Sequence, residues 1–174
     1  MTLSIPRPTT RRLGALALVA ALSACGGGKP DAMYFAEPRA SQAALHPNET
    51  PELRALIQKY SRLYGVPEDL VHRVVIRESR HRPGARNGPY YGLMQILPAT
   101  ARGMGYRGEP AGLLDAETNL KYGVKYLRGA YMVADGNHDA AVKWYARGYY
   151  YEARDRCMLV ETGLAARETG RRCR

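Results

Sequence analysis

The chain has 174 residues, a length that favours one domain with appendages over several domains. Its formal net charge of +10 indicates an anionic partner, such as a membrane headgroup, nucleic acid or a carboxylate-bearing cell-wall polymer, unless the surface is merely soluble and basic. The export signal described next disfavours nucleic acid among these partners.

The first 24 residues are arranged like a secretory signal. Three arginines precede a short apolar run over residues 13–22, which is too short to span a bilayer permanently. The segment Leu22-Ser23-Ala24-Cys25 resembles a bacterial lipobox, which implies that Cys25 is lipidated and becomes the first mature residue. An ordinary export signal or a short membrane anchor is the alternative. Because Gly26 gives no retention signal of the aspartate type, we expect the lipid to hold the protein at the periplasmic face of the outer membrane.

The three cysteines fit an exported protein. With Cys25 carrying lipid, Cys157 and Cys173 remain in a compartment where disulfides persist, so we expect these two to pair. Closing a loop of this length stabilises a fold by about 3 kcal/mol in the chain-entropy model.

After the signal, residues 25–50 contain several glycines and prolines and show no sustained periodicity, so we interpret them as a lipidated, flexible tether. The folded domain is then expected over residues 51–174, including a C-terminal extension. Thr50 can cap a first helix, and Gly65 ends it. A second helix begins after Pro67 with acids in its first turn, and its apolar residues recur at helical spacing: Leu70, Val71, Val74 and Val75.

Further along the chain, residues 83–92 are rich in glycine, proline and asparagine and are predicted to form a loop. A short helix is expected near Pro98, a longer one after an Asp115 cap, and a further one after an Asp139 cap. No segment alternates convincingly as a strand, and no repeat is present. The pattern predicts an all-α fold.

Glu78 lies on the apolar face of the second predicted helix. It follows Val71, Val74 and Val75 by seven, four and three residues, and this face is the one that a helix buries. Burial and a nearby helix C-terminus both raise the pKa of a carboxyl group, and an acid that stays protonated near neutral pH can serve as a general acid. The alternative is an ion pair with a neighbouring arginine: Arg77, Arg80 or Arg82.

Several segments together share the pattern of a known family. Glu78-Ser79 is followed by Gly92-Leu93-Met94-Gln95-Ile96, then by Asn119-Leu120 with Gly123 and Tyr126-Leu127, and lastly by residues 140–148. These segments resemble the catalytic core of the soluble lytic transglycosylases, goose-lysozyme-like enzymes that cut peptidoglycan. The likeness covers about residues 55–150 and implies a lysozyme-like helical domain with Glu78 as the catalytic acid/base.

The resemblance also assigns residues that would surround the substrate. It implies that Gln95 lines the sugar cleft, that Met94 shapes the cleft floor, and that Tyr145 hydrogen-bonds the catalytic glutamate. Ser79 begins the family signature. Asn87 stands where the family usually has a serine, and we expect it to keep a hydrogen bond to a substrate carbonyl. The predicted substrate-binding residues are therefore Ser79, Asn87, Met94, Gln95 and Tyr145.

The chain also departs from the family pattern. Ala146 replaces the asparagine of the Ala-Tyr-Asn segment and removes whatever that side chain anchors. Tyrosines make up 13 of the aromatic residues, and tyrosine suits stacking on sugars because it has an apolar face and a polar tip. We take Tyr90, Tyr91 and Tyr149 as candidates for the cleft.

No cofactor is expected from the sequence. The four histidines, His46, His72, His81 and His138, show no metal-ligand spacing. The segment 103–108 fits G-x-G-x-x-G, but no strand precedes it, so we interpret it as a loop.

Most glycoside hydrolases need two carboxylates, whereas the resemblance implies a single glutamate assisted by the N-acetyl group of the substrate. The downstream acids Asp115 and Glu117 fit better as a helix cap and a first-turn acid. We expect a lipid-anchored lytic transglycosylase that cleaves the MurNAc–GlcNAc bond of peptidoglycan and forms 1,6-anhydro-MurNAc. The alternatives are a hydrolytic muramidase or chitinase-like enzyme on the same fold, and a catalytically silent peptidoglycan-binding lipoprotein.

Overall fold

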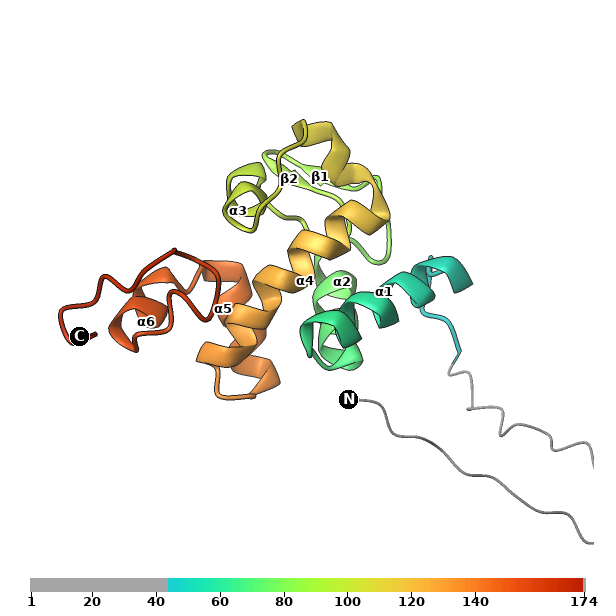
Figure 1. Ribbon diagram of the computed structural model, residues 1–174. Helices are drawn as coiled ribbons and strands as arrows, with labels where there is room; N and C mark the ends of the chain where they lie inside the picture. The colour runs from blue at the N-terminus through green and yellow to red at the C-terminus, as the bar shows by residue number, and fades with distance from the viewer. Residues whose placement is uncertain (1–43, 174) are drawn as a thin grey trace, which may run out of the picture. The chain divides into compact units, whose positions relative to one another are not determined.

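The computed structural model describes residues 44–173 (Figure 1). The predicted signal, Cys25 and the tether as far as residue 43 lie outside the described residues. The described part is mostly helical, as the periodicity predicted. No helix within it is both long enough and apolar enough to cross a membrane. The elements in chain order are α1 (Pro51–Tyr64), α2 (Glu68–Glu78), β1 (Arg86–Asn87), β2 (Tyr90–Tyr91), α3 (Pro98–Gly103), the 3-10 helix η1 (Pro110–Leu114), α4 (Ala116–Val133), α5 (His138–Arg147) and α6 (Tyr150–Asp155).

Local capping signals set the ends of α1 and the start of α4. The Thr50 hydroxyl accepts a hydrogen bond from the Leu53 N–H at 3.2 Å, and the Asp115 carboxylate accepts one from the Thr118 N–H at 2.8 Å. Gly65 ends α1 with a φ of 63°, a left-handed conformation that favours glycine. All three signals were read from the sequence, and the structure confirms them.

The predicted cap of α5 was wrong. The side chain of Asn137, two residues before Asp139, accepts the hydrogen bond from the Ala140 N–H at 2.9 Å. Asn137 has the extended backbone that a cap needs, with φ −79° and ψ 117°. Asp139 lies in the first turn of the helix and forms an ion pair with Arg73 of α2.

Helix α4 lies at the centre of the described domain and contacts α1, α3, η1 and α5 (Figure 1). Its buried stripe includes Leu120, Val124 and Leu127, none of which has exposed surface. The largest apolar cluster is formed where this stripe meets α1, α2 and α5. A smaller cluster joins the segment after β2 to α3 and η1, and consists of Ile96, Ala101, Tyr106 and Leu113.

A short antiparallel ribbon occupies the predicted loop over residues 83–92. Strands β1 and β2 pair Arg86 with Tyr91 and Asn87 with Tyr90. Two-residue strands are too short to give an alternating pattern, which is why the sequence did not predict them. Tyr91 also pairs with Ile96 through two backbone hydrogen bonds of 3.2 and 3.1 Å. The segment between these two residues, Gly-Leu-Met-Gln, is thereby folded into a tight turn.

The folded domain begins earlier than residue 51. Residues 46–49 form a turn in which the Glu49 N–H donates to the His46 carbonyl at 3.0 Å, and the Glu49 side chain has no exposed surface. The Asn48 side chain donates to the Arg80 carbonyl at 3.0 Å. The last residues of the predicted tether therefore belong to the domain, because the buried carboxylate of Glu49 pairs with Arg54 of α1.

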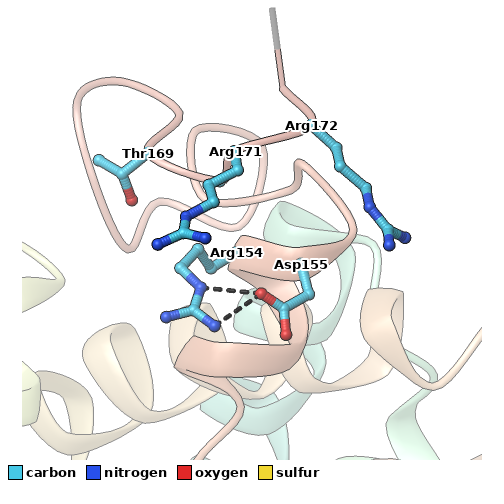
Figure 2. Close-up of a pocket in the computed structure, with 6 residues that line it drawn as sticks. Arg154, Asp155, Thr169, Arg171 and Arg172 are labelled. Atoms are coloured by element: carbon cyan, nitrogen blue, oxygen red, sulfur yellow. Dashed lines mark hydrogen bonds and ion pairs between the residues drawn. The ribbon is translucent and has the colours of Figure 1, made fainter.

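At the other end of the described chain, a disulfide joins Cys157 and Cys173, whose Cα atoms are 5.3 Å apart. The bridge holds the extension after α6 against that helix. A hollow of about 580 Å³ lies beside the bridge (Figure 2). It is lined by three arginines and by smaller polar residues: Arg154, Asp155, Thr169, Gly170, Arg171 and Arg172.

Candidate active site

Glu78 is the last residue of α2, and its side chain is 23% exposed. Burial raises the pKa of its carboxyl group above the ordinary value of 4.5. The Arg77 guanidinium, with Nε 3.5 Å from Oε1 of Glu78, opposes this shift but does not cancel it. The sequence offered two interpretations of Glu78, a buried acid and the partner of an arginine. The structure shows both features, since the residue is partly buried and has Arg77 beside it. The carboxyl group is more readily protonated than one in water.

A sharp turn follows Glu78 and separates it from the ribbon. Arg80 and His81 both have left-handed backbones, with φ of 54° and 58°. Ser79 caps the helix, and its hydroxyl donates to the Val75 carbonyl at 3.2 Å. Because Ser79 is only 5% exposed, the structure places it inside the fold and not at a surface where a sugar could touch it.

Met94 and Tyr145 are both buried and are joined by a hydrogen bond. The Tyr145 hydroxyl donates to the Met94 carbonyl at 2.8 Å, and no hydrogen bond joins Tyr145 to Glu78 in the described structure. Burial raises the pKa of Tyr145 well above its ordinary value, and the charge of Glu78 raises it further. Met94 has no exposed surface. Tyr145 therefore holds the Met94 backbone in place.

Asn119 of α4 fixes the same turn from the opposite side. Its side-chain oxygen accepts from the Met94 N–H at 2.8 Å, and its amide nitrogen donates to the carbonyls of Tyr91 and Leu113 at 2.8 and 2.7 Å. A Cβ atom on Gly92 would collide with the Asn119 side chain, so this close approach requires glycine. The sequence did offer a signal for this role, because an asparagine on the apolar stripe of a helix must find partners when it is buried.

Gln95 is half-buried and has a left-handed backbone with a φ of 46°. Its amide nitrogen donates to the carbonyls of Gly92 and Ala85 at 2.8 and 3.1 Å. These two bonds use both N–H groups of the side chain, so its carbonyl oxygen is the polar atom left over. Gln95 thus joins the tight turn to the residues that precede the ribbon.

The ribbon carries the exposed candidates. Asn87 on β1 is exposed, and Tyr90, its partner on β2, is 42% exposed. Tyr91 is half-buried beneath the Arg86 guanidinium, which lies 4.8 Å from the ring centroid. Tyr149 is only 1% exposed, and its hydroxyl donates to the Tyr126 carbonyl at 2.8 Å. Tyr149 is therefore part of the apolar core, and its assignment to the cleft was wrong.

The two acids considered as a second catalytic carboxylate have other partners. Asp115 caps α4, and this backbone hydrogen bond lowers the pKa of its carboxyl group. Glu117 accepts hydrogen bonds from Lys59 and Tyr60, which lower its pKa. Both acids therefore have structural partners, and Arg77 is the charged group that lowers the pKa of Glu78. The hollow in Figure 2 is lined by other residues and is not part of this site.

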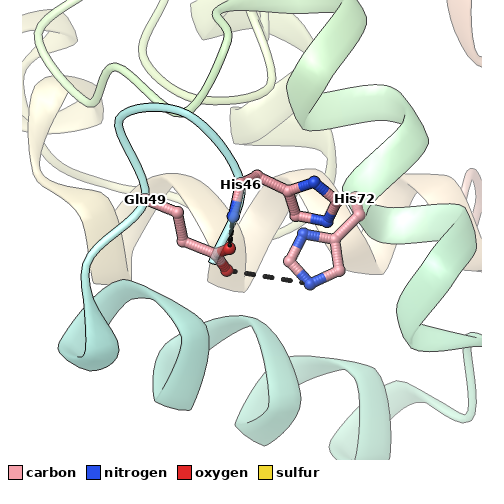
Figure 3. Close-up of side chains that lie close together, drawn as sticks. All are labelled: His46, Glu49 and His72. Atoms are coloured by element: carbon pink, nitrogen blue, oxygen red, sulfur yellow. Dashed lines mark hydrogen bonds and ion pairs between the residues drawn. The ribbon is translucent and has the colours of Figure 1, made fainter. Parts of the chain in front are cut away.

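Three of the four histidines, which show no ligand spacing in the sequence, lie together in the structure. His46 and His72 lie beside Glu49, with one possible ligand atom from each within 4.8 Å of the others (Figure 3). His81 contacts His72. Burial lowers the pKa of both His72 and His81, that of His81 to about 4. This cluster was missed because its members come from three separate segments.

The arrangement around Glu78 suits proton transfer to and from a polymer bound at the surface. Glu78 is an acid with a raised pKa, Tyr145 is hydrogen-bonded to the turn at Met94, and the ribbon that precedes this turn has exposed polar and aromatic side chains. In a comparison with protein families, the family model of the transglycosylase SLT domain matches residues 55–155. This is more than half of the chain, from α1 to the end of α6. The match contains Glu78, the turn at Met94 and Tyr145, and it confirms the resemblance seen in the sequence. The chain therefore belongs to the transglycosylase SLT family, with its all-α lysozyme-like fold and, at the level of the family, a transglycosylase-type activity that lyses peptidoglycan.

Proposed function

We propose that this protein cleaves the MurNAc–GlcNAc β-1,4 bond of peptidoglycan and releases 1,6-anhydro-MurNAc, with Glu78 as its only catalytic carboxylate. The observation that supports this proposal most directly is that Glu78 is partly buried with a raised pKa. Asp115 and Glu117, the acids considered as its catalytic partner, are engaged in a helix cap and in hydrogen bonds from Lys59 and Tyr60. A hydrolase with two catalytic acids would need such a partner.

In this mechanism, the protonated Glu78 gives its proton to the glycosidic oxygen as the bond to the anomeric carbon breaks. The carbonyl oxygen of the substrate's own N-acetyl group bonds to that carbon and stabilises its positive charge. The carboxylate of Glu78 then takes the proton of the 6-hydroxyl of the same sugar. The 6-oxygen bonds to the anomeric carbon and displaces the N-acetyl oxygen, so Glu78 is protonated again and no water is consumed.

The neighbouring residues have distinct roles in this proposal. The free carbonyl oxygen of Gln95 accepts a hydrogen bond from the glycan, and the exposed amide of Asn87 bonds to a substrate carbonyl. Met94 and Tyr145 contribute by holding the turn beside the acid, because both are buried. Ser79 acts only through the cap of α2, since its hydroxyl is bonded within the helix.

The product of the reaction tests the proposal. The tethered 6-hydroxyl reaches the anomeric carbon ahead of a diffusing water because its entropy has already been lost. Mass spectrometry of digested peptidoglycan should therefore find muropeptide ends that lack one water and resist borohydride reduction. Reducible MurNAc ends as the main product would assign a hydrolytic muramidase instead. Binding to sacculi without any release of fragments would assign a silent wall-binding protein.

We also propose that a lipid on Cys25 holds the enzyme at the periplasmic face of the outer membrane. The lipobox-like sequence before this cysteine supports the proposal. The Cys25→Ser variant should move from the membrane fraction to the soluble fraction of the cell. A variant that stayed in the membrane would indicate an uncleaved N-terminal segment as the anchor.

A further inference from the structure

The histidine cluster has the composition of a transition-metal site. His46 and Glu49 come from the turn before α1, and His72 comes from the first half of α2 (Figure 3). Two imidazoles and one carboxylate form a donor set that binds Zn²⁺, with water able to complete a tetrahedral shell. His46 is partly exposed, which leaves a path for an ion to enter, whereas His72 and Glu49 are buried.

The His72 ring has an atom that the rest of the fold does not satisfy. The residue is only 6% exposed, and its buried Nε2 atom has no hydrogen-bond partner among residues 44–173. Two carboxylate oxygens lie near this nitrogen without bonding to it, Oε1 of Glu68 at 3.5 Å and Oε1 of Glu49 at 3.8 Å. A cation between the nitrogen and these oxygens would satisfy all three atoms.

The other nitrogen of His72 fixes which tautomer can bind an ion. Its Nδ1 atom lies 3.1 Å from Nε2 of His81, so one of the two rings donates to the other. When His72 is the donor, its Nε2 atom carries a lone pair that points toward Glu49. Ligand histidines in metal sites are held in this way by a hydrogen bond from their second nitrogen, and His81 would act as that supporting residue.

Glu49 retains the capacity to bind an ion despite its ion pair. Arg54 donates to Oε1 at 2.6 Å and to Oε2 at 2.7 Å, and the His46 N–H donates to Oε2 at 2.8 Å. A carboxylate has four lone pairs, so the remaining one is on Oε1, the atom nearest His72. Tetrahedral ligands at zinc distances lie about 3.3 Å apart, so the 3.8 Å between Oε1 and Nε2 needs to shorten only slightly.

We propose that His46, Glu49 and His72 bind one Zn²⁺ ion, with His81 supporting His72. The ion would tie the turn before α1 to α2, the helix that ends at Glu78. This site is separate from the proposed peptidoglycan-cleaving site, and neither proposal depends on the other.

The test uses the full-length chain, purified without a polyhistidine tag and stripped of metal with a chelator. Titration of Zn²⁺ in competition with a chromophoric chelator should give one ion per chain and a higher melting temperature. X-ray absorption of the zinc complex should show nitrogen and oxygen ligands at about 2.0–2.1 Å. Absence of stoichiometric binding, or of a shift in melting temperature, would overturn the proposal.

Variants identify the ligands. His46→Ala is the most informative change because His46 is the ligand that is not fully buried, and it should weaken binding by about 100-fold or more while the chain still folds. His81→Gln should weaken binding by about 10- to 100-fold, the effect of losing a supporting residue. His138→Ala is the matched control, because this histidine lies on α5 beside Asp69, and binding should not change. If His46→Ala bound zinc as tightly as the unaltered chain, or if His138→Ala bound it as weakly as His46→Ala, the site would be wrongly assigned.

Discussion

Glu49 is buried and Glu78 is partly buried, yet their carboxyl groups have opposite pKa shifts. Burial alone would raise both. For Glu49 the hydrogen bonds from Arg54 and the His46 N–H, with the nearby charges of His72 and Arg54, outweigh burial and lower the pKa to about 2. Within the part of the chain that the structure describes, Glu78 has one ion-pair partner, Arg77 at 3.5 Å, and burial raises its pKa. The number and geometry of donors therefore decide which buried glutamate is a fixed charge and which can exchange a proton.

The largest expected effect comes from removing the acid whose pKa is raised. Glu78→Gln should lower the rate of peptidoglycan release by about 100-fold or more, because it removes the proton donor at nearly constant volume. Release of soluble fragments from purified sacculi measures this rate. Circular dichroism melting should show that the variant folds as stably as the unaltered chain. A variant that kept more than about a tenth of the rate would exclude Glu78 as the acid.

Removing the carboxylate whose pKa is lowered, that of Glu49, should affect the stability of the fold and not the rate of the reaction. Glu49→Gln removes the buried charge that pairs with Arg54 and should lower the free energy of unfolding by about 3 kcal/mol, measured by urea denaturation with a chelator present. The rate of peptidoglycan release per folded molecule should stay the same. Glu161→Gln, a change at an exposed glutamate, is the matched control and should not move the midpoint of urea unfolding. A large loss of activity in folded Glu49→Gln would break the distinction between the two residues.

A milder change tests whether donor geometry lowers the pKa of Glu49. Arg54→Lys keeps the charge but loses the fork that bonds both carboxylate oxygens. We expect a loss of about 1.5 kcal/mol in the free energy of unfolding, the value of one hydrogen bond to a charged group. Equal stability of the two proteins would mean that charge alone is sufficient at this position.

The smallest expected effect concerns pH. Because Glu78 must be protonated to act as an acid, kcat/KM should fall as the pH rises through its raised pKa. The contribution of this residue to stability has the same sign, being full below the ordinary pKa of 4.5 and lost as the pH rises through the folded pKa. Arg77→Gln removes a charge that lowers this pKa. The alkaline limb of the plot of kcat/KM against pH should therefore move to higher pH. Arg80→Gln is the comparison variant and should leave this limb of the pH profile in place, since the ion pair with Glu78 is made by Arg77.

The sequence predicted those features that depend on neighbours within one helical turn. The caps at Thr50 and Asp115 are of this kind, because donor and acceptor are three residues apart. The α5 cap failed because Asn137 and Asp139 are both suitable residue types, and only the backbone angles distinguish them. The prediction that Tyr149 lies in the cleft failed because composition does not distinguish a tyrosine that stacks on sugar from one whose hydroxyl forms a hydrogen bond inside the core.

The features that the sequence did not reveal join distant segments. His46, His72 and His81 meet only when the turn before α1 packs against α2 and the turn after it. The family pattern identified Glu78 and Tyr145, but it did not indicate that the Tyr145 hydroxyl bonds to Met94. Side-chain partners of this sort depend on how helices pack, and spacing along one helix does not encode that packing.

The three hydrogen bonds of Asn119 have a consequence for the order of folding. Its partners Tyr91 and Met94 are 28 and 25 residues away, so the turn that contains Met94 cannot be held until α4 has docked. The Met94 N–H is buried by this contact and by the core around it. Its hydrogen should therefore exchange with deuterium only when the α4 packing opens, as slowly as the slowest amides within α4 itself. The turn beside the acid, although it is a loop by secondary structure, would share the stability of the central helix.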